Sequence, residues 1–232
     1  MSFLLVRAAI LATVMLCCLE LRASIHAGDQ IKFGDGVGTP GGVFYIDDLN
    51  DPGNPDFATF CVEITEFINF TSTYAVQSIG LVTVNGGKTL QPITAWLYNS
   101  FLDGALNHFN PTSLADVNAL QLAIWKGMGY TEAEIKQYIG TSWYNTYNAV
   151  LAGNSLQPGK PWYADFAADT SWSGVGEIRV MNLRKVVNGA YTDYAQDQLV
   201  RVPAPEPWSA AVWGLLAISV GTFGNRRRHN DR

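Results

Sequence analysis

The chain of 232 residues has only three cysteines and three histidines. Cys17 and Cys18 lie in an apolar stretch near its start, so the middle of the chain keeps Cys61 alone. A single cysteine excludes an internal disulfide, and a lone thiol in an oxidising compartment must be buried, paired with another chain or used chemically. His108 is the only histidine between residues 28 and 202, which excludes a zinc cluster and most Ser-His or Cys-His catalytic pairs.

Basic residues are also scarce in the middle of the chain. Between residues 28 and 204, nine Lys and Arg stand against seventeen Asp and Glu, a balance of −8. We therefore expect no nucleic acid and no anionic membrane surface as a partner of this segment. Charged residues make up 15% of the chain and aromatic residues 12%, which argues against disorder. The segment has no linker or repeat, and we expect one domain over residues 28–202.

Both ends of the chain have the pattern of targeting segments. Arg7 precedes an apolar stretch at residues 8–19, and small residues follow at 23, 24 and 27, which predicts a cleaved signal peptide over residues 1–27. Residues 208–224 are mostly apolar and would extend about 25 Å as a helix, slightly short of the roughly 30 Å hydrocarbon core of a membrane. The arginines that follow predict a transmembrane helix with its C-terminal end in the cytoplasm.

The C-terminal segment resembles the PEP-CTERM sorting signal of Gram-negative bacteria. That signal has three parts, which are matched here in order by a Pro-Glu-Pro motif, the apolar helix and an arginine cluster: Pro205, Glu206, Pro207, Arg226, Arg227 and Arg228. The resemblance implies a sorting tail over residues 203–232 that holds the protein in the inner membrane. The resemblance also implies that an exosortase then releases or transfers the protein to the cell surface or the extracellular matrix. An ordinary single-span anchor is the alternative.

Cys61 lies in a segment that alternates in the manner of a β-strand. The alternation over residues 57–64 places Phe57, Thr59, Cys61 and Glu63 on one face. The other face holds only apolar side chains. The pattern therefore predicts that Cys61 is not on the plainly apolar face.

Gln121 interrupts the apolar stripe of a predicted helix. The helix begins at Ser113 as N-cap, with Asp116 at the third position, and extends to residue 126. Gln121 shares one stripe, turned to the core, with Val117, Leu120 and Ile124. A buried amide without partners costs about 1 to 3 kcal/mol, so we expect Gln121 to be hydrogen-bonded or chemically consumed.

The two segments together resemble the bacterial thioester domains, also called TQXA domains. The Leu120 to Trp125 segment matches their Thr-Gln-x-Ala-aliphatic-Trp motif, and Phe60 to Glu63 matches the aromatic-Cys-aliphatic-acidic context of their cysteine. The resemblance implies an internal thioester between Cys61 and Gln121, which reacts with an amine or hydroxyl on another surface. Leu120 stands where the family usually has Thr. Without a thioester, Cys61 is a small half-buried residue and Gln121 a core amide bonded to backbone.

Two further kinds of site have weaker signals. Acidic residues crowd a segment rich in Pro and Gly, where oxygen ligands can hold calcium or simply form a surface turn: Asp47, Asp48, Asp51 and Asp56. A hydrolase would need a carboxylate pair, either Asp47 with Asp48 or Glu63 with Glu66. These residues show no sign of burial in the sequence, so we expect no enzyme activity and no diffusible cofactor.

The order of predicted elements indicates an α+β fold. Strands are expected first, at residues 30–33, 42–46, 57–64, 74–77 and 81–84. Helices follow at 92–106, 113–126, 131–139 and 143–151, and strands return at 176–182 and 198–202. Strands thus enclose a helical insertion in a single domain. The expected function is adhesion or matrix attachment to an amine, hydroxyl or polysaccharide target, and a noncovalent binding or structural matrix protein of the same fold is the alternative.

Overall fold

The structure is a computed structural model that describes residues 25–38, 41–50, 57–154 and 157–202. Residues up to Arg201 form one compact unit, and the second unit, Val202–Arg232, lies outside the described residues except for Val202. The signal peptide predicted at residues 1–27 lies outside them except for its last three residues. The predicted sorting tail, with Pro205, Glu206, Pro207, Arg226, Arg227 and Arg228, lies entirely outside. No helix of the described part is long and apolar enough to cross a membrane.

The unit is a mixture of α-helices and an antiparallel sheet. The sheet has six strands in the order β3-β2-β1-β4-β7-β8. Their bounds are Gln30–Asp35 (β1), Phe44–Asp48 (β2), Phe57–Thr59 (β3), Thr73–Gly80 (β4), Ile178–Val187 (β7) and Ala190–Arg201 (β8). A separate two-stranded ribbon joins Gly153–Asn154 (β5) to Gln157–Pro158 (β6).

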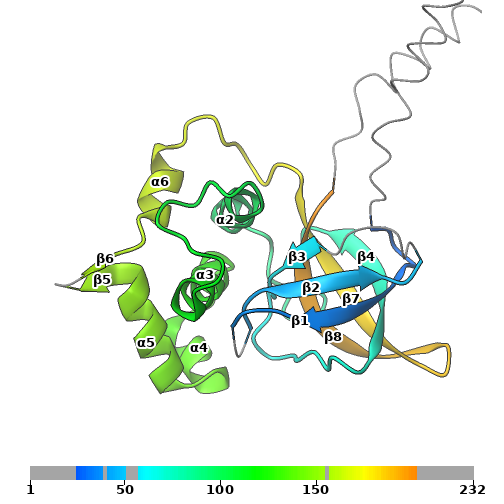
Figure 1. Cartoon of the computed structure of the whole chain (residues 1–232). Helices are drawn as coiled ribbons and strands as arrows, with labels where there is room; N and C mark the ends of the chain where they lie inside the picture. Colours follow the sequence, from blue (N-terminus) through cyan, green and yellow to red (C-terminus); the bar gives the residue numbers. More distant parts are fainter. Residues whose placement is uncertain (1–24, 39–40, 51–56, 155–156, 203–232) are drawn as a thin grey trace, which may run out of the picture. The chain divides into compact units, whose positions relative to one another are not determined.

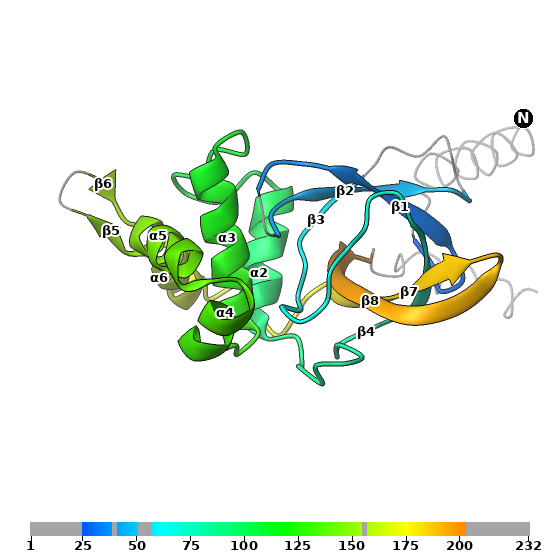
Figure 2. The same cartoon turned by 90° about the horizontal axis from the view of Figure 1, so that it is seen from below.

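The six-stranded sheet curls until its two edges meet (Figure 2). After β3 the chain continues beside β8, where Cys61 forms an antiparallel bridge with Gln198. Backbone hydrogen bonds from Val62 N to Asp197 O (3.0 Å) and from Leu199 N to Phe60 O (3.0 Å) extend this pairing. Because both edges find partners, the sheet leaves fewer open backbone groups at this end. Cys61 is therefore fixed by the closure of the sheet.

Five helices lie between β4 and β7 in the described chain. They are Pro92–Leu102 (α2), Leu114–Gly127 (α3), Glu132–Tyr138 (α4), Thr141–Ala152 (α5) and Trp162–Ala168 (α6). In Figures 1 and 2, α2 and α3 lie between the sheet and α5. This arrangement buries the middle of α3 on all sides, and every residue from Val117 to Trp125 is buried. The strands at both ends of the described unit thus enclose a helical segment, as the sequence pattern predicted.

The predicted helix starts at Ser113 and Thr131 are confirmed, whereas two strand predictions are wrong. The strand expected over residues 81–84 is absent, and only an isolated bridge joins Val82 to Thr89 there. The Ser113 side chain accepts a hydrogen bond from Asp116 N, and Thr131 with Glu134 forms a complete capping box. The strand expected over residues 57–64 ends at Thr59, and every residue from Thr59 to Ile64 is buried. Two-sided burial makes the alternation uninformative, because the segment lies between β8 and the helices. The short helix α6 was not predicted, although Pro161 directly before its first residue is a typical start signal.

Candidate functional site

Cys61 is held in the interior by the strand pairing on either side of it. Its residue is 0% exposed, as are Phe60 and Val62. The bridge to Gln198 and the hydrogen bond from Val62 N fix its backbone against β8. Cys61 is a free thiol. Because both faces of this segment are buried, the alternation predicted which residues share a face with Cys61 but not that this face is also in the interior.

Gln121 lies in the second turn of α3 and is also 0% exposed. The helix begins at the Ser113 cap, and this start determines which face of α3 carries the Gln121 side chain. Leu120, which replaces the threonine usual in the thioester domains, is fully buried and provides no hydroxyl. Gln121 thus faces its partner without a neighbouring hydroxyl from the preceding residue.

The structure brings Cys61 and Gln121 into direct contact. Cys61 Sγ donates a hydrogen bond to Gln121 Oε1 at 3.2 Å. Gln121 Nε2 donates in turn to the backbone carbonyl of Cys61 at 2.8 Å. The carbonyl carbon of Gln121 is one bond of about 1.23 Å away from Oε1, so the sulfur lies beside the atom that a thiolate would attack. Sixty positions of sequence therefore separate two side chains that touch.

A backbone N–H completes the surroundings of the Gln121 carbonyl. Gly42 N donates to Gln121 Oε1 at 3.2 Å, in the loop before β2. A donor aimed at a carbonyl oxygen stabilises the negative charge that develops there during nucleophilic attack. Gly41 packs directly on the amide, because a Cβ at this position would lie 2.9 Å from Gln121 Cγ. Its φ of +83° also favours glycine.

Burial controls the reactivity of the thiol. Desolvation raises the pKa of Cys61 far above its ordinary value, and the charge of Glu63 raises it further. Hydrogen bonds with the Cys61 backbone and with the Trp125 indole act in the opposite direction and are weaker. The sulfur is therefore a protonated thiol at neutral pH. Such a thiol is inert toward solvent oxidants and needs a reaction partner that is already in contact.

The structure also reveals a buried acidic cluster that the sequence analysis missed. Glu63 and Asp197 are buried, so the expectation that Glu63 lacks burial is wrong. Glu63 accepts from Gly86 N (3.0 Å) and Asp197 N (3.3 Å), and Asp197 accepts from Val84 N, Asn182 Nδ2 and Leu183 N. Burial, together with the charge of Glu63, raises the pKa of Asp197 to about 7. The alternation around Glu63 was the available signal, but it does not reveal what covers the residue.

Glu66 lies beside this cluster and is half-buried. Burial raises the pKa of Glu66, and the nearby Glu63 adds to the increase, while a hydrogen bond from Asn85 opposes it. Both oxygens of Glu63 are occupied by backbone N–H groups. The cluster therefore connects the chain after β3 to the segment at residues 83–86 and to β8.

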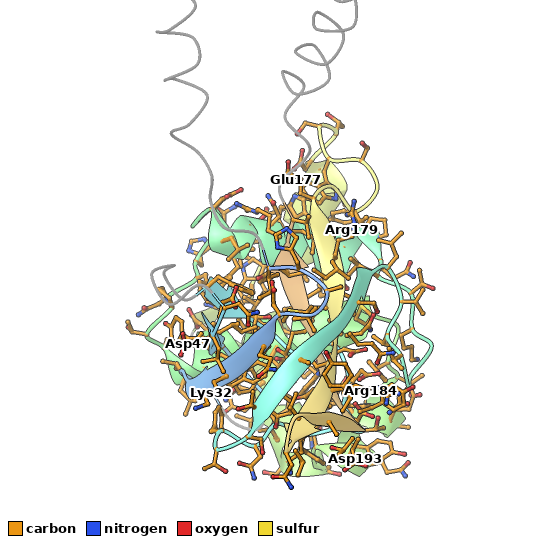
Figure 3. All side chains as sticks on the ribbon, turned by 90° about the vertical axis from the view of Figure 1, so that its right-hand side faces the viewer. Lys32, Asp47, Glu177, Arg179, Arg184 and Asp193 are labelled. Atoms are coloured by element: carbon orange, nitrogen blue, oxygen red, sulfur yellow. The ribbon has the colours of Figure 1, made fainter. Side chains whose placement is uncertain are left out.

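The predicted calcium ligands are only partly described. Asp51 and Asp56 lie outside the described residues. Asp47 is opposite Lys32 in the pairing of β1 with β2, and Figure 3 shows both on the face of the sheet that is turned away from the helices. Asp48 Oδ1 accepts a hydrogen bond from Asn50 N at 2.9 Å, as in a surface turn. Among the described side chains, no group of three or more acidic, His or Cys residues is placed to hold a metal ion. The calcium site stays a prediction.

Comparison of the chain with protein-family models, curated proteins and solved structures finds no match.

Proposed function

We propose that this is an exported, surface-sorted protein that attaches covalently to its target through an internal thioester between Cys61 and Gln121. The observation that carries the proposal is the 3.2 Å contact between Cys61 Sγ and Gln121 Oε1 in a fully buried setting. Two residues that match the motifs of the thioester domains are thus in reach of each other. The fold would then be a domain of thioester type, with strands around a helical insertion.

Formation of the thioester needs only the two side chains. The sulfur attacks Gln121 Cδ, and the negative charge that develops on Oε1 is stabilised by the Gly42 N–H. The bond between Cδ and Nε2 breaks, and the thiol proton moves to Nε2, which leaves as ammonia. The donor at Gly42 supplies the polarisation that a hydroxyl at position 120 would otherwise contribute. A free thiolate is not needed, because direct contact strongly raises the effective concentration of the thiol at the Gln121 carbonyl.

The thioester would act once. Its carbonyl lacks amide resonance and stays electrophilic, so an amine or hydroxyl of another molecule can take the glutamyl group and release the thiol. Burial of both side chains excludes water until such an acceptor arrives. The protein would therefore need no diffusible cofactor and would not turn over as an enzyme.

Intact mass of the purified residues 28–202 tests the proposal. We expect a deficit of one ammonia, which disappears on treatment with methylamine and is absent in Cys61→Ala. Gln137→Ala, an exposed glutamine on α4, is the matched control and should keep the deficit. A full mass with a titratable thiol in the wild-type protein would reject the thioester.

A noncovalent binding or structural matrix protein of the same fold is the second candidate. It is favoured by the strongly raised pKa of Cys61 and by the hydrogen bonds that already occupy the Gln121 amide. In that case the pair is a packing feature that connects α3 to the closed sheet. The same mass measurement separates the two candidates.

The destination of the protein rests on its two ends. We infer a signal peptide at residues 1–27 and a PEP-CTERM tail at 203–232, in which a transmembrane helix holds the protein in the inner membrane until an exosortase acts. Replacement of Pro205, Glu206 and Pro207 by alanine should keep the protein in the membrane fraction. Replacement of Arg226, Arg227 and Arg228 should disturb its orientation. Unchanged release to the surface in both variants would contradict the sorting proposal.

A further inference from the structure

The indole N–H of Trp125 is a buried donor without an oxygen or nitrogen acceptor in the described part of the chain. Trp125 is only 1% exposed, so bulk solvent does not reach this donor. The fully buried Trp162, by contrast, donates its indole N–H to Asn107 O at 2.9 Å. An indole N–H can only donate, and a buried donor is costly to leave without a partner. Trp125 therefore needs an explanation that Trp162 does not.

The group on which the Trp125 N–H acts is the Cys61 sulfur. Burial raises the pKa of Cys61, while hydrogen bonds with its own backbone and with the Trp125 side chain oppose that increase. A hydrogen bond lowers the pKa of a thiol by stabilising the thiolate, so the N–H is directed at the sulfur. A neutral thiol is a weak acceptor, whereas hydrogen bonds to an ionised group are stronger. The interaction is therefore weak in the resting thiol and strengthens when the sulfur gains negative charge.

Three elements of the fold hold the Trp125 ring beside the reacting pair. Trp125 lies four residues after Gln121 on α3, so the two side chains are on the same face of the helix. A Cβ at Gly41 would lie 3.1 Å from Trp125 Cη2 and 3.2 Å from Gln121 Cδ, so both side chains border this glycine. The ring also packs against Trp143 of α5, with 5.6 Å between the ring centroids. The direction of the N–H is thus fixed by α3, by the loop before β2 and by α5.

The two donors at this site serve different atoms. Gly42 N donates to Gln121 Oε1 at 3.2 Å, and the Trp125 N–H acts on the sulfur. When a thioester is opened, negative charge develops first on the carbonyl oxygen and then on the departing sulfur. The charge of Glu63 raises the pKa of Cys61 and so acts against a negative sulfur. A donor on the sulfur offsets this effect at the moment when the bond breaks.

We propose that Trp125 takes part in this chemistry and that its indole N–H stabilises the Cys61 sulfur as the leaving group when an acceptor opens the thioester. The inference rests on the thioester proposed above. The nitrogen or oxygen of the acceptor attacks Gln121 Cδ, the bond between Cδ and Sγ breaks, and its electron pair stays on sulfur. The indole N–H donates to that charge and keeps its own proton. The proton that the acceptor loses ends on Sγ, and the products are a glutamyl amide or ester and the free thiol.

The test measures how fast methylamine opens the thioester of the purified protein, by intact mass over time. Trp125→Phe keeps an aromatic ring without the N–H. It should still lose one ammonia during maturation, but it should open roughly 10- to 100-fold more slowly than wild type, as expected when a hydrogen bond to a charged group is lost. Trp162→Phe also loses a buried indole N–H, the one that donates to Asn107 O. It is the matched control and should open at the wild-type rate.

Two analogues at position 125 separate the N–H from the shape of the ring, and they decide the test if Trp125→Phe does not fold or does not form the bond. β-(3-Benzothienyl)alanine keeps the bicyclic shape but has sulfur in place of the N–H, and it should open slowly or fail to form the thioester. 5-Fluorotryptophan keeps the N–H and should match the wild type. Opening of the benzothienyl protein at the wild-type rate would overturn the role of the Trp125 N–H and leave the thioester in place. A wild-type protein that never loses ammonia would reject the thioester itself and this inference with it.

Discussion

Asp197 is a buried carboxylate whose pKa lies near neutrality. Its pKa of about 7 follows from burial and from the charge of Glu63, which its three hydrogen-bond donors offset only in part. In the unfolded chain the same group titrates near 4. Between these values the folded protein binds more protons than the unfolded chain. The contribution of Asp197 to the free energy of unfolding should therefore be fully present below about pH 4 and be lost as the pH rises through about 7.

We predict that the Asp197 contribution makes the protein less stable at pH 8 than at pH 5, by about 2 to 3 kcal/mol. Urea unfolding at several pH values measures it. Asp197→Asn should flatten this dependence, even if it lowers stability overall by mismatching the donors of Val84 and Leu183. Asp193→Asn, exposed on the same strand and labelled in Figure 3, should leave the dependence as in wild type. An equal slope in both variants would assign the dependence to another group.

Gly41 tests how closely the loop before β2 packs on the Gln121 amide. An alanine Cβ would lie 2.9 Å from Gln121 Cγ and 3.1 Å from Trp125 Cη2, in a backbone conformation with φ of +83°. Gly87 has a φ of +57° but no atom within 4 Å of its Cβ position, so it separates backbone strain from contact. We expect Gly41→Ala to cost about 1 to 3 kcal/mol more than Gly87→Ala in chemical denaturation. Equal costs would show that contact with the amide is not tight.

At the scale of elements, helix α3 determines the direction of Gln121. Its rotation is set at the first turn, where the Ser113 hydroxyl accepts from Asp116 N at 3.3 Å. We predict that Ser113→Ala lowers the free energy of unfolding by about 1 kcal/mol, as for other N-caps. Thr112→Ala, one position outside the helix, is the nearest control. A loss in Thr112→Ala equal to that in Ser113→Ala would contradict the assigned cap.

The elements also show what the sequence could predict and what it could not. Helix starts were accessible, because Ser113 and Thr131 form caps from residues three positions apart. The contact of Cys61 with Gln121 was accessible only through the motif resemblance. The burial of Glu63 and Asp197 could not be predicted, since it depends on β8 pairing with the chain beside Cys61 across more than 130 positions.

At the scale of the whole unit, the Cys61 and Gln121 pair joins the closed sheet to the buried helix α3. A covalent bond there would close a loop of about sixty residues, and such a crosslink stabilises by roughly 4 kcal/mol through the entropy of the unfolded chain, less any strain. Methylamine would open such a bond without changing any other residue, so it offers a comparison within one sequence.

We predict that methylamine lowers the melting temperature of wild-type protein and leaves that of Cys61→Ala unchanged. With a crosslink worth a few kcal/mol, the wild-type shift should be several degrees for a domain of this size. Calorimetry before and after treatment measures the shift, and treated Cys61→Ala is the control for the effect of the amine as a solute. An equal shift in Cys61→Ala would assign the effect to solvent. No shift in a wild-type protein that has reacted would mean that packing between the sheet and α3, and not the bond, determines the stability of the unit.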